Sequence, residues 1–261
     1  MKIIIESKDN KHFREFIKLT AADGVRKYGK VIVSGKKLLR ELAQSASGNC
    51  LALITYERYA DENREMQTIV QSFADAGSLY TLKKHLFNEL DTFNTGAPLL
   101  VIRVPDIPEW DYSPAEGCNL LIPFQDPLNV GAVIRSAAGF GVKKIIMLKE
   151  AAHPFHPRSI KSSAGAVFKA NLFSGPSIYE LKSVCDKHKL NIVTLDMSGA
   201  PVSSYTFPER FLLLPGLEGQ GVPEELKASA ISIPISSSIE SLNAAIAASV
   251  VLYSWNSRSS K

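Results

Sequence analysis

The sequence predicts an α/β protein in which a smaller α/β domain precedes a domain built on a parallel sheet. Its 261 residues suffice for one large domain or two small ones. Apolar segments and helical segments alternate regularly in the second half, as is typical of a parallel sheet covered on both faces. A proline-rich stretch near residue 110 separates the halves, so we expect domains over 1–104 and 117–261 and a linker over 105–116.

The first half contains short strands and helices. The segments 31–33, 50–55 and 99–104 are apolar and predict buried strands, whereas 63–74 and 82–90 have helical spacing. The ten residues 105–114 then contain three prolines. Because proline fixes φ and lacks a backbone N–H, this stretch predicts an extended linker.

The second half alternates between the two kinds of element. We expect strands over 120–124, 144–148, 191–195, 211–214 and 231–235, and helices over 130–140, 178–188, 223–228 and 241–255. The last helix is apolar on both faces, with Ile246 and Val250 on one and Ala247 and Val251 on the other. A helix that is apolar all round is buried, so we expect the sheet on one side and a second subunit on the other.

The composition excludes several classes of protein. With 45% hydrophobic and 21% charged residues, the chain is neither wholly disordered nor a coiled coil. Its apolar runs fall short of the ~20 residues of a membrane helix, and the apolar N-terminal run is too short for a secretory signal. Three cysteines at unrelated spacings suggest reduced thiols and a cytoplasmic protein.

Positive charge is concentrated in two clusters, although the net charge is only +4. Residues 8–40 contain ten Lys or Arg against three acids, and residues 143–169 contain six against one. Such clusters suit a polyanionic partner. Solvated helix faces explain the charge equally well.

Three stretches could carry chemistry. In residues 124–142, Asp126 or Asn129 could cap a helix on which Arg135 points roughly opposite to Asn129. A capped helix with one surface arginine is the plain alternative.

The second stretch, 215–223, is a glycine-rich loop after a strand. It contains Gly216, Gly219 and Gly221 around Glu218, and glycine lets backbone approach a ligand closely. The order matches neither the dinucleotide fingerprint nor a phosphate-binding P-loop. A simple tight turn is the alternative.

In the third stretch, 233–249, a strand and a serine-rich loop lead into the last helix. Ser241 is the expected N-cap, and Asn243 is expected to be buried in the first turn. A buried amide needs partners, so Asn243 either joins loops or holds a ligand. Elsewhere, His153 and His156 are too isolated to predict a metal site, and Lys161 is expected at a helix start, where it could meet phosphate.

In this order and spacing, the stretches resemble the motifs of the SpoU (TrmH-like) RNA 2′-O-ribose methyltransferases of the SPOUT superfamily. The resemblance covers residues 117–257, and the first half resembles the ribosomal-protein-like RNA-binding domain often fused before this catalytic domain. The matching motif residues are Asn129, Gly131 and Arg135; Gly216, Glu218, Gly219 and Gly221; and Ile233, Pro234, Ser241, Leu242 and Asn243. Ser34, Leu217 and Ser236–Ser238 depart from the family's usual residues.

The resemblance implies a deep trefoil knot, a homodimer formed through the C-terminal domain, S-adenosylmethionine as cofactor and RNA as substrate, with no metal or membrane. It assigns catalytic roles to Arg135, Asn129, Glu218, Asn243 and Ser241. It assigns cofactor binding to Leu214, Gly216, Gly219, Ile233, Leu242 and Asn243. RNA contacts are expected from Arg26, Lys27, Lys30, Lys36 and Lys161.

The implied reaction moves a methyl group from S-adenosylmethionine to a ribose 2′-hydroxyl. A guanidinium stays protonated at physiological pH, so Arg135 could act as a base only with a very large pKa shift. The less demanding role is to hold the target phosphate and stabilise the forming alkoxide. The two-domain form favours ribosomal RNA over transfer RNA. A non-catalytic RNA-binding or ribosome-assembly factor and a nucleotide-binding oxidoreductase are the competing hypotheses.

Overall fold

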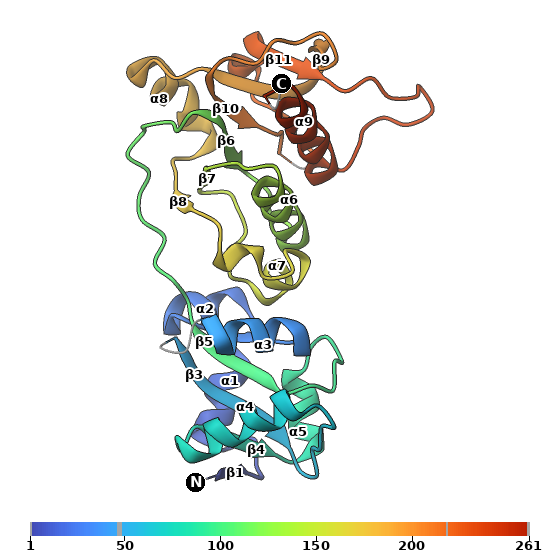
Figure 1. The fold of residues 1–261 in the computed structure, drawn as a ribbon. Helices are drawn as coiled ribbons and strands as arrows, with labels where there is room; N and C mark the ends of the chain where they lie inside the picture. Colours follow the sequence, from blue (N-terminus) through green and yellow to red (C-terminus); the bar gives the residue numbers. More distant parts are fainter. Residues whose placement is uncertain (1, 46–48, 218, 260–261) are drawn as a thin grey trace. The chain divides into compact units, whose positions relative to one another are not determined.

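A computed structural model describes residues 2–45, 49–217 and 219–259. The chain divides into two compact units (Figure 1), of which the first is Met1–Pro105 with Phe155–Pro157 and the second is Asp106–Pro154 with Arg158–Lys261. Each unit has its own sheet. All three cysteines are free thiols. Within the described ranges, no helix has the length and apolar character needed to cross a membrane.

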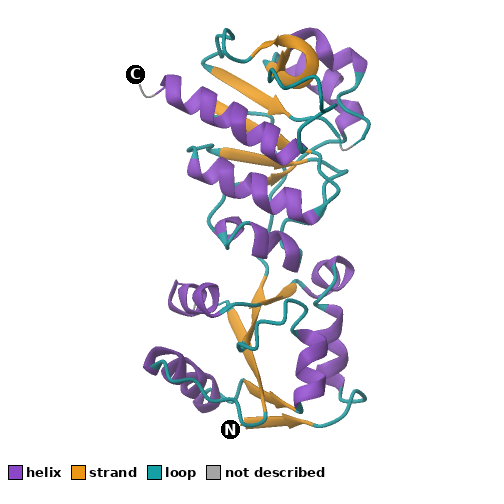
Figure 2. Ribbon diagram, turned by 90° about the vertical axis from the view of Figure 1, so that its right-hand side faces the viewer, coloured by secondary structure: helices purple, strands orange, loops and turns teal. Residues whose placement is uncertain are grey.

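The first unit is a mixed sheet with the strand order β1-β4-β3-β5-β2 and helices on both faces (Figure 2). Strands β1, β4 and β3 are parallel, whereas β5 runs antiparallel to β3 and β2. The strands are β1 Lys2–Ile5, β2 Lys30–Val33, β3 Cys50–Tyr56, β4 Leu79–Leu82 and β5 Leu99–Arg103. The helices are α1 Lys11–Lys18, α2 Ala22–Tyr28, α3 Lys36–Ser45, α4 Arg64–Asp75 and α5 Lys84–Leu90.

The structure adds elements to the five predicted in this unit. The predicted strands correspond to β2, β3 and β5, and the predicted helices to α4 and α5. Helix α1 places Phe13 and Phe16 in the core and is capped by Asn10, whose Oδ1 accepts a hydrogen bond from His12 N at 2.9 Å. Strands β1 and β4 were not predicted, and each has only four residues.

The second unit is an all-parallel six-stranded sheet with the order β11-β9-β10-β6-β7-β8. The alternation predicts the parallel arrangement and five of these strands, but not β8. In Figure 1, α8 lies on one side of this sheet and α6 and α9 lie on the other. The strands are β6 Gly117–Ile122, β7 Lys144–Met147, β8 Leu172–Ser174, β9 Ile192–Pro201, β10 Arg210–Leu214 and β11 Ala230–Ser232. The helices are α6 Pro127–Gly139, α7 Pro157–Ser162, α8 Leu181–His188 and α9 Ala244–Ser259, with short 3₁₀ turns at Ala166–Phe168 (η1), Ile178–Glu180 (η2) and Glu224–Ser229 (η3).

Part of the predicted linker belongs to this second sheet. Trp110 N donates to Ser174 O at 2.9 Å, and Ser174 N donates to Pro108 O at 2.8 Å. The Trp110 side chain is only 4% exposed and packs in the core with Leu121 and Leu212. The stretch is extended, but residues 108–110 are paired along β8 rather than running free.

The last helix is buried on one side within the single chain, as predicted, and the expected second subunit on its other side stays a prediction. Ala248 and Val251 are fully buried. Ile246, Val250 and Tyr253 are 57%, 37% and 61% exposed. Because the sheet has only one face to offer this helix, its other side presents apolar surface to the surroundings.

Candidate functional site

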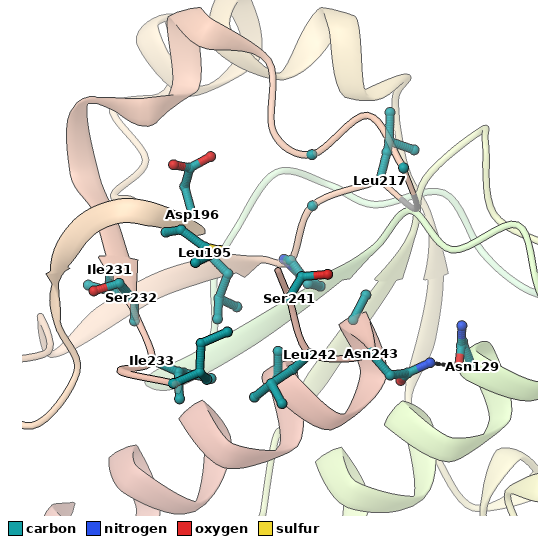
Figure 3. Close-up of a pocket in the computed structure, with 18 residues that line it drawn as sticks. Asn129, Leu195, Asp196, Leu217, Ile231, Ser232, Ile233, Ser241, Leu242 and Asn243 are labelled. Atoms are coloured by element: carbon teal, nitrogen blue, oxygen red, sulfur yellow. Dashed lines mark hydrogen bonds between the residues drawn. The ribbon is translucent and has the colours of Figure 1, made fainter. Parts of the chain in front are cut away.

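The three motif stretches meet at one cavity of about 460 Å³ in the second unit (Figure 3). Because parallel strands end at the same edge of a sheet, the segments after β10 and β11 lie close together, and β9 supplies another wall. The lining residues that come from the predicted motifs are Asn129, Gly216, Gly219, Gly221, Ile233, Ser241, Leu242 and Asn243.

The glycine-rich loop forms a closed turn at the mouth of this cavity. Leu217 N donates to Gly221 O, and Gly221 N donates to Leu217 O, both at 2.9 Å. A Cβ atom on Gly216 would lie 3.0 Å from the Gly221 backbone. A side chain at position 216 would therefore press on the Gly221 backbone, so the close turn favours glycine there, in addition to any contact with a ligand.

Asn243 joins the first and third motifs. Its Nδ2 donates to Asn129 Oδ1 at 3.0 Å, and its Oδ1 accepts from Ala245 N at 3.0 Å and Ile246 N at 3.2 Å. Asn243 is thus the N-cap of α9, and the prediction of Ser241 as the cap is wrong. Asn243 is also exposed rather than buried, because the helix start opens onto the cavity.

Helix α6 carries the first motif. Of the two residues that could cap it, Asp126 is the N-cap, and its Oδ1 accepts from Leu128 N at 2.9 Å. Gly131 is packed against α7, since a Cβ there would lie 2.2 Å from Ser159 O. Arg135 is exposed, and it is not among the described residues that line the cavity of its own chain.

Two further predicted residues do not contribute a described side chain to the cavity. Leu214 is fully buried in the core and does not line it. The hydrophobic side chain anchors the end of β10, and the loop begins only at Pro215. Glu218 lies outside the residues that the structure describes.

The opposite wall of the cavity includes an acid that the motifs do not contain. Asp196, beside Leu195 and Met197 on β9, lines the cavity. Hydrogen bonds from Ser198, and then the nearby Lys227 ammonium, lower the pKa of its carboxyl. A polar residue directly after the apolar run 192–195 was the available sequence signal.

Most of the predicted RNA-contacting residues are already near an acid or a ring. Lys30 Nζ lies 2.6 Å from Glu15 Oε1, and Lys36 Nζ lies 2.7 Å from Asp61 Oδ2. Arg26 and Asp23 are 3.6 Å apart, and Lys27 Nζ lies 5.7 Å from the Tyr28 ring centroid. Lys161 is exposed in the last turn of α7, so its predicted place at a helix start is wrong.

Comparison with known proteins identifies the family. The profile of the SpoU rRNA Methylase family matches residues 120–253, about half of the chain, and the match includes all three stretches that meet at the cavity. The chain belongs to this family. The resemblance noted in the sequence is thereby confirmed.

Relatives are similar in sequence to this chain, and solved structures are similar in fold. Ribosomal RNA small subunit methyltransferase G 2 of Syntrophobacter fumaroxidans is 41% identical over 97% of this chain and 49% of its own length, so the chain spans about half of that relative. The 23S rRNA (guanosine(2553)-2′-O)-methyltransferase RlmP of Bacillus subtilis is 26% identical over 95% of this chain and 97% of its own length. An AdoMet-bound rRNA methyltransferase from Sinorhizobium meliloti has a TM-score of 0.80 at 19% identity, covering 98% of both chains. The predicted α/β fold class is confirmed.

Proposed function

We propose that this SpoU-family protein is an S-adenosylmethionine-dependent RNA 2′-O-methyltransferase acting on ribosomal RNA. The observation that carries the proposal is the meeting of the three family motifs at one cavity of about 460 Å³. Relatives whose names specify ribosomal RNA methylation support the choice of substrate. Transfer RNA is the alternative substrate.

The cavity suits the proposed donor. Apolar side chains such as Leu195, Ile231 and Leu242 offer a surface for an adenine ring, and the loop at Gly216 and Gly219 brings backbone to the cavity. The backbone at Ile233 and Leu242 completes the adenosine site. When bound, S-adenosylmethionine supplies an electrophilic sulfonium methyl group.

The chain's own residues then orient the acceptor hydroxyl, and its proton passes to solvent as the oxygen attacks the methyl group, because Arg135 on α6 is exposed to water. Asn243 and Asn129 hold the two loops together, with Ser241 beside them and Glu218 assigned a supporting role in the glycine loop. Leu214 acts from the core as an anchor of that loop. Arg135, exposed on α6, holds a phosphate of the RNA and stabilises the forming alkoxide, since a guanidinium is a poor base and a good two-pronged donor.

The remaining contacts to RNA come from the first unit and from α7. We assign Met1–Val104 the role of RNA-binding domain, residues 105–116 the connection, and 117–261 the catalytic domain. Arg26, Lys27, Lys30, Lys36 and Lys161 attract the phosphate backbone. Such contacts release counterions and make binding salt-dependent.

A homodimer, a knot and a cytoplasmic location complete the proposal. The groove between α6 and α9, with Leu128, Ile246 and Tyr253 exposed around it, supports pairing of two catalytic domains. The trefoil knot is proposed from membership of the SpoU family. The three free thiols fit a cytoplasmic protein.

The test is to map 2′-O-methyl positions in total RNA from cells with and without the gene, and to repeat the methylation with purified protein. We expect one or more ribosomal RNA positions to lose the mark when the gene is absent. If a transfer RNA position loses the 2′-O-methyl mark instead, the substrate is transfer RNA rather than ribosomal RNA. If calorimetry shows no binding of S-adenosylmethionine and no mark changes, the protein is a non-catalytic RNA-binding factor.

A further inference from the structure

Asp196 is the one ionisable side chain among the described residues that line the cavity. The other lining residues are apolar, glycine, or neutral and polar. Figure 3 shows Asp196 next to Leu195, on the side of the cavity opposite Asn129 and Asn243. A carboxylate in a largely apolar wall is costly unless donors surround it, so the donors around Asp196 decide what it can do for a ligand.

The two carboxylate oxygens of Asp196 differ in how they are occupied. Oδ1 accepts from Ser198 N at 3.0 Å and from Ser198 Oγ at 2.6 Å. Oδ2 has a longer contact, 3.6 Å to Lys227 Nζ. An ionised carboxylate has about four acceptor sites, so Oδ2 keeps capacity for donors supplied by a ligand. The side chain is 19% exposed, which makes it accessible from the cavity.

The neighbouring lysine decides which donors fit. The charge of Asp196 is already balanced in part by Lys227, which also pairs with Glu224 at 2.9 Å. A second ammonium group, such as that of a methionine moiety, would be repelled by the Lys227 ammonium. A ligand carboxylate would be repelled by Asp196 itself. Neutral hydroxyl donors avoid both penalties.

We propose that Asp196 accepts hydrogen bonds from the ribose hydroxyls of the adenosine part of the methyl donor and so selects a ribonucleoside there. This inference rests on the proposed function, which makes the cavity a donor site. Acidic side chains at the end of a parallel strand recognise ribose hydroxyls in unrelated nucleotide-binding folds by the same chemistry. Ser198 positions the carboxylate, and Lys227 keeps it ionised without competing for the diol.

The experiment measures binding of four nucleosides by calorimetry. The probes are S-adenosylhomocysteine, 5′-methylthioadenosine, which lacks the amino acid, and the 2′-deoxy and 3′-deoxy forms of 5′-methylthioadenosine. Wild-type protein should bind at least one deoxy form about ten- to hundredfold more weakly than the ribonucleoside, as expected for loss of a hydrogen bond to a charged group. Asp196→Asn should weaken S-adenosylhomocysteine and 5′-methylthioadenosine by the same factor and should no longer distinguish the ribose from the deoxyribose form.

Asp111→Asn is the matched control. Asp111 also accepts from a serine two residues later, Ser113 N at 3.1 Å and Oγ at 2.6 Å, and pairs with Lys144 at 3.4 Å, but it does not line the cavity. This variant should bind all four nucleosides as the wild type does. If Asp196→Asn does not fold, two measurements still test the proposal. One is the wild-type difference in affinity between the ribose and deoxyribose forms, and the other is Ser198→Ala, which should make this difference smaller.

Three results would overturn the inference. One is equal wild-type affinity for the ribose form and both deoxy forms. Another is an Asp196→Asn variant that keeps the wild-type ribose preference. The third is a loss confined to S-adenosylhomocysteine, which would assign Asp196 to the ammonium group. If the wild type binds none of these nucleosides, the proposed function itself fails, so the two failures are distinguishable.

Discussion

Asn243 provides a quantitative test of how the cavity is held together. Its Oδ1 caps α9, and its Nδ2 joins the cap to Asn129 on α6. Asn243→Ala removes both interactions. Asn243→Ser keeps an oxygen suited to capping but is too short to reach Asn129, so the pair of variants separates the two effects.

The magnitudes follow from the two kinds of bond. Loss of an N-cap costs about 1 kcal/mol, and loss of a partly solvated hydrogen bond costs about 0.5–1 kcal/mol. We therefore expect Asn243→Ala to lower the free energy of unfolding by about 2 kcal/mol, and Asn243→Ser by about 0.5–1 kcal/mol. For a domain of this size, the alanine variant should melt about 4–8 °C lower than the wild type.

Urea unfolding followed by tryptophan fluorescence is the assay. Both tryptophans, Trp110 and Trp255, belong to the second unit, and Trp255 is on α9 itself. The signal therefore reports on the unit that contains the substitution. Equal decreases in the free energy of unfolding for the two variants would show that the N-cap of α9 does not contribute to stability. An unchanged Asn243→Ala protein would refute the role of this residue in the fold altogether.

Four further predictions concern binding, catalysis and pH. Gly216→Val should weaken S-adenosylmethionine binding at least about tenfold, measured by calorimetry, because the added side chain displaces the loop. Gly139→Val is the control and should leave this binding unchanged, because a Cβ at that position meets nothing within 4 Å. Arg135→Lys should slow single-turnover methylation by about 100-fold while donor affinity is kept, because charge remains and the two-pronged geometry is lost. Binding to ribosomal RNA fragments should fall steeply as salt rises in fluorescence anisotropy titrations. Hydrogen bonding from Lys36 holds the pKa of Asp61 at about 2, below the unfolded value of about 3.9. The ionised Asp61 therefore stabilises the fold fully above the unfolded pKa, and this stabilisation is lost as the pH falls through the folded pKa. Asp61→Asn should reduce the loss of unfolding free energy at acidic pH, measured by circular dichroism.

Each of these expectations has a contrary result. Unchanged donor affinity in Gly216→Val would remove the loop from the binding site. Near-normal methylation by Arg135→Lys would rule out a specific guanidinium role. Salt-independent RNA affinity would contradict phosphate contacts by the basic clusters. An acid limb of the same steepness in Asp61→Asn would exclude the Lys36–Asp61 pair as its source.

The sequence predicted the second unit better than the first. Strand and helix alternate there along the chain, and the parallel sheet follows from that alternation. The residues at the cavity could be predicted from the sequence because motif positions such as Gly216 and Asn243 follow the ends of parallel strands. In the first unit, β1 and β4 were missed: they pair with each other, and β4 also pairs with β3, although the three isoleucines of β1 are typical of a strand.

The errors at the site have equally physical causes. Ser241 and Asn243 are both good capping residues two positions apart, and tertiary contact with Asn129 decides where α9 begins. Leu214 belongs to a strand whose side chains alternate between faces, and burial of that position is set by α8 on the far side of the sheet. Asp196 was missed because it lies outside the motifs and reaches the cavity only through the parallel pairing of β9 with its neighbours.

The pairing of residues 108–110 with β8 determines where a fragment can be cut. Removal of these residues would strip the backbone partners from Ser174 and uncover the core around Trp110. Strand β8 would then be an exposed edge strand, whose unpaired N–H and C=O groups can pair with other chains and so promote aggregation. A fragment of the second unit intended to stay monodisperse on its own should therefore begin before Pro108, not at the start of β6.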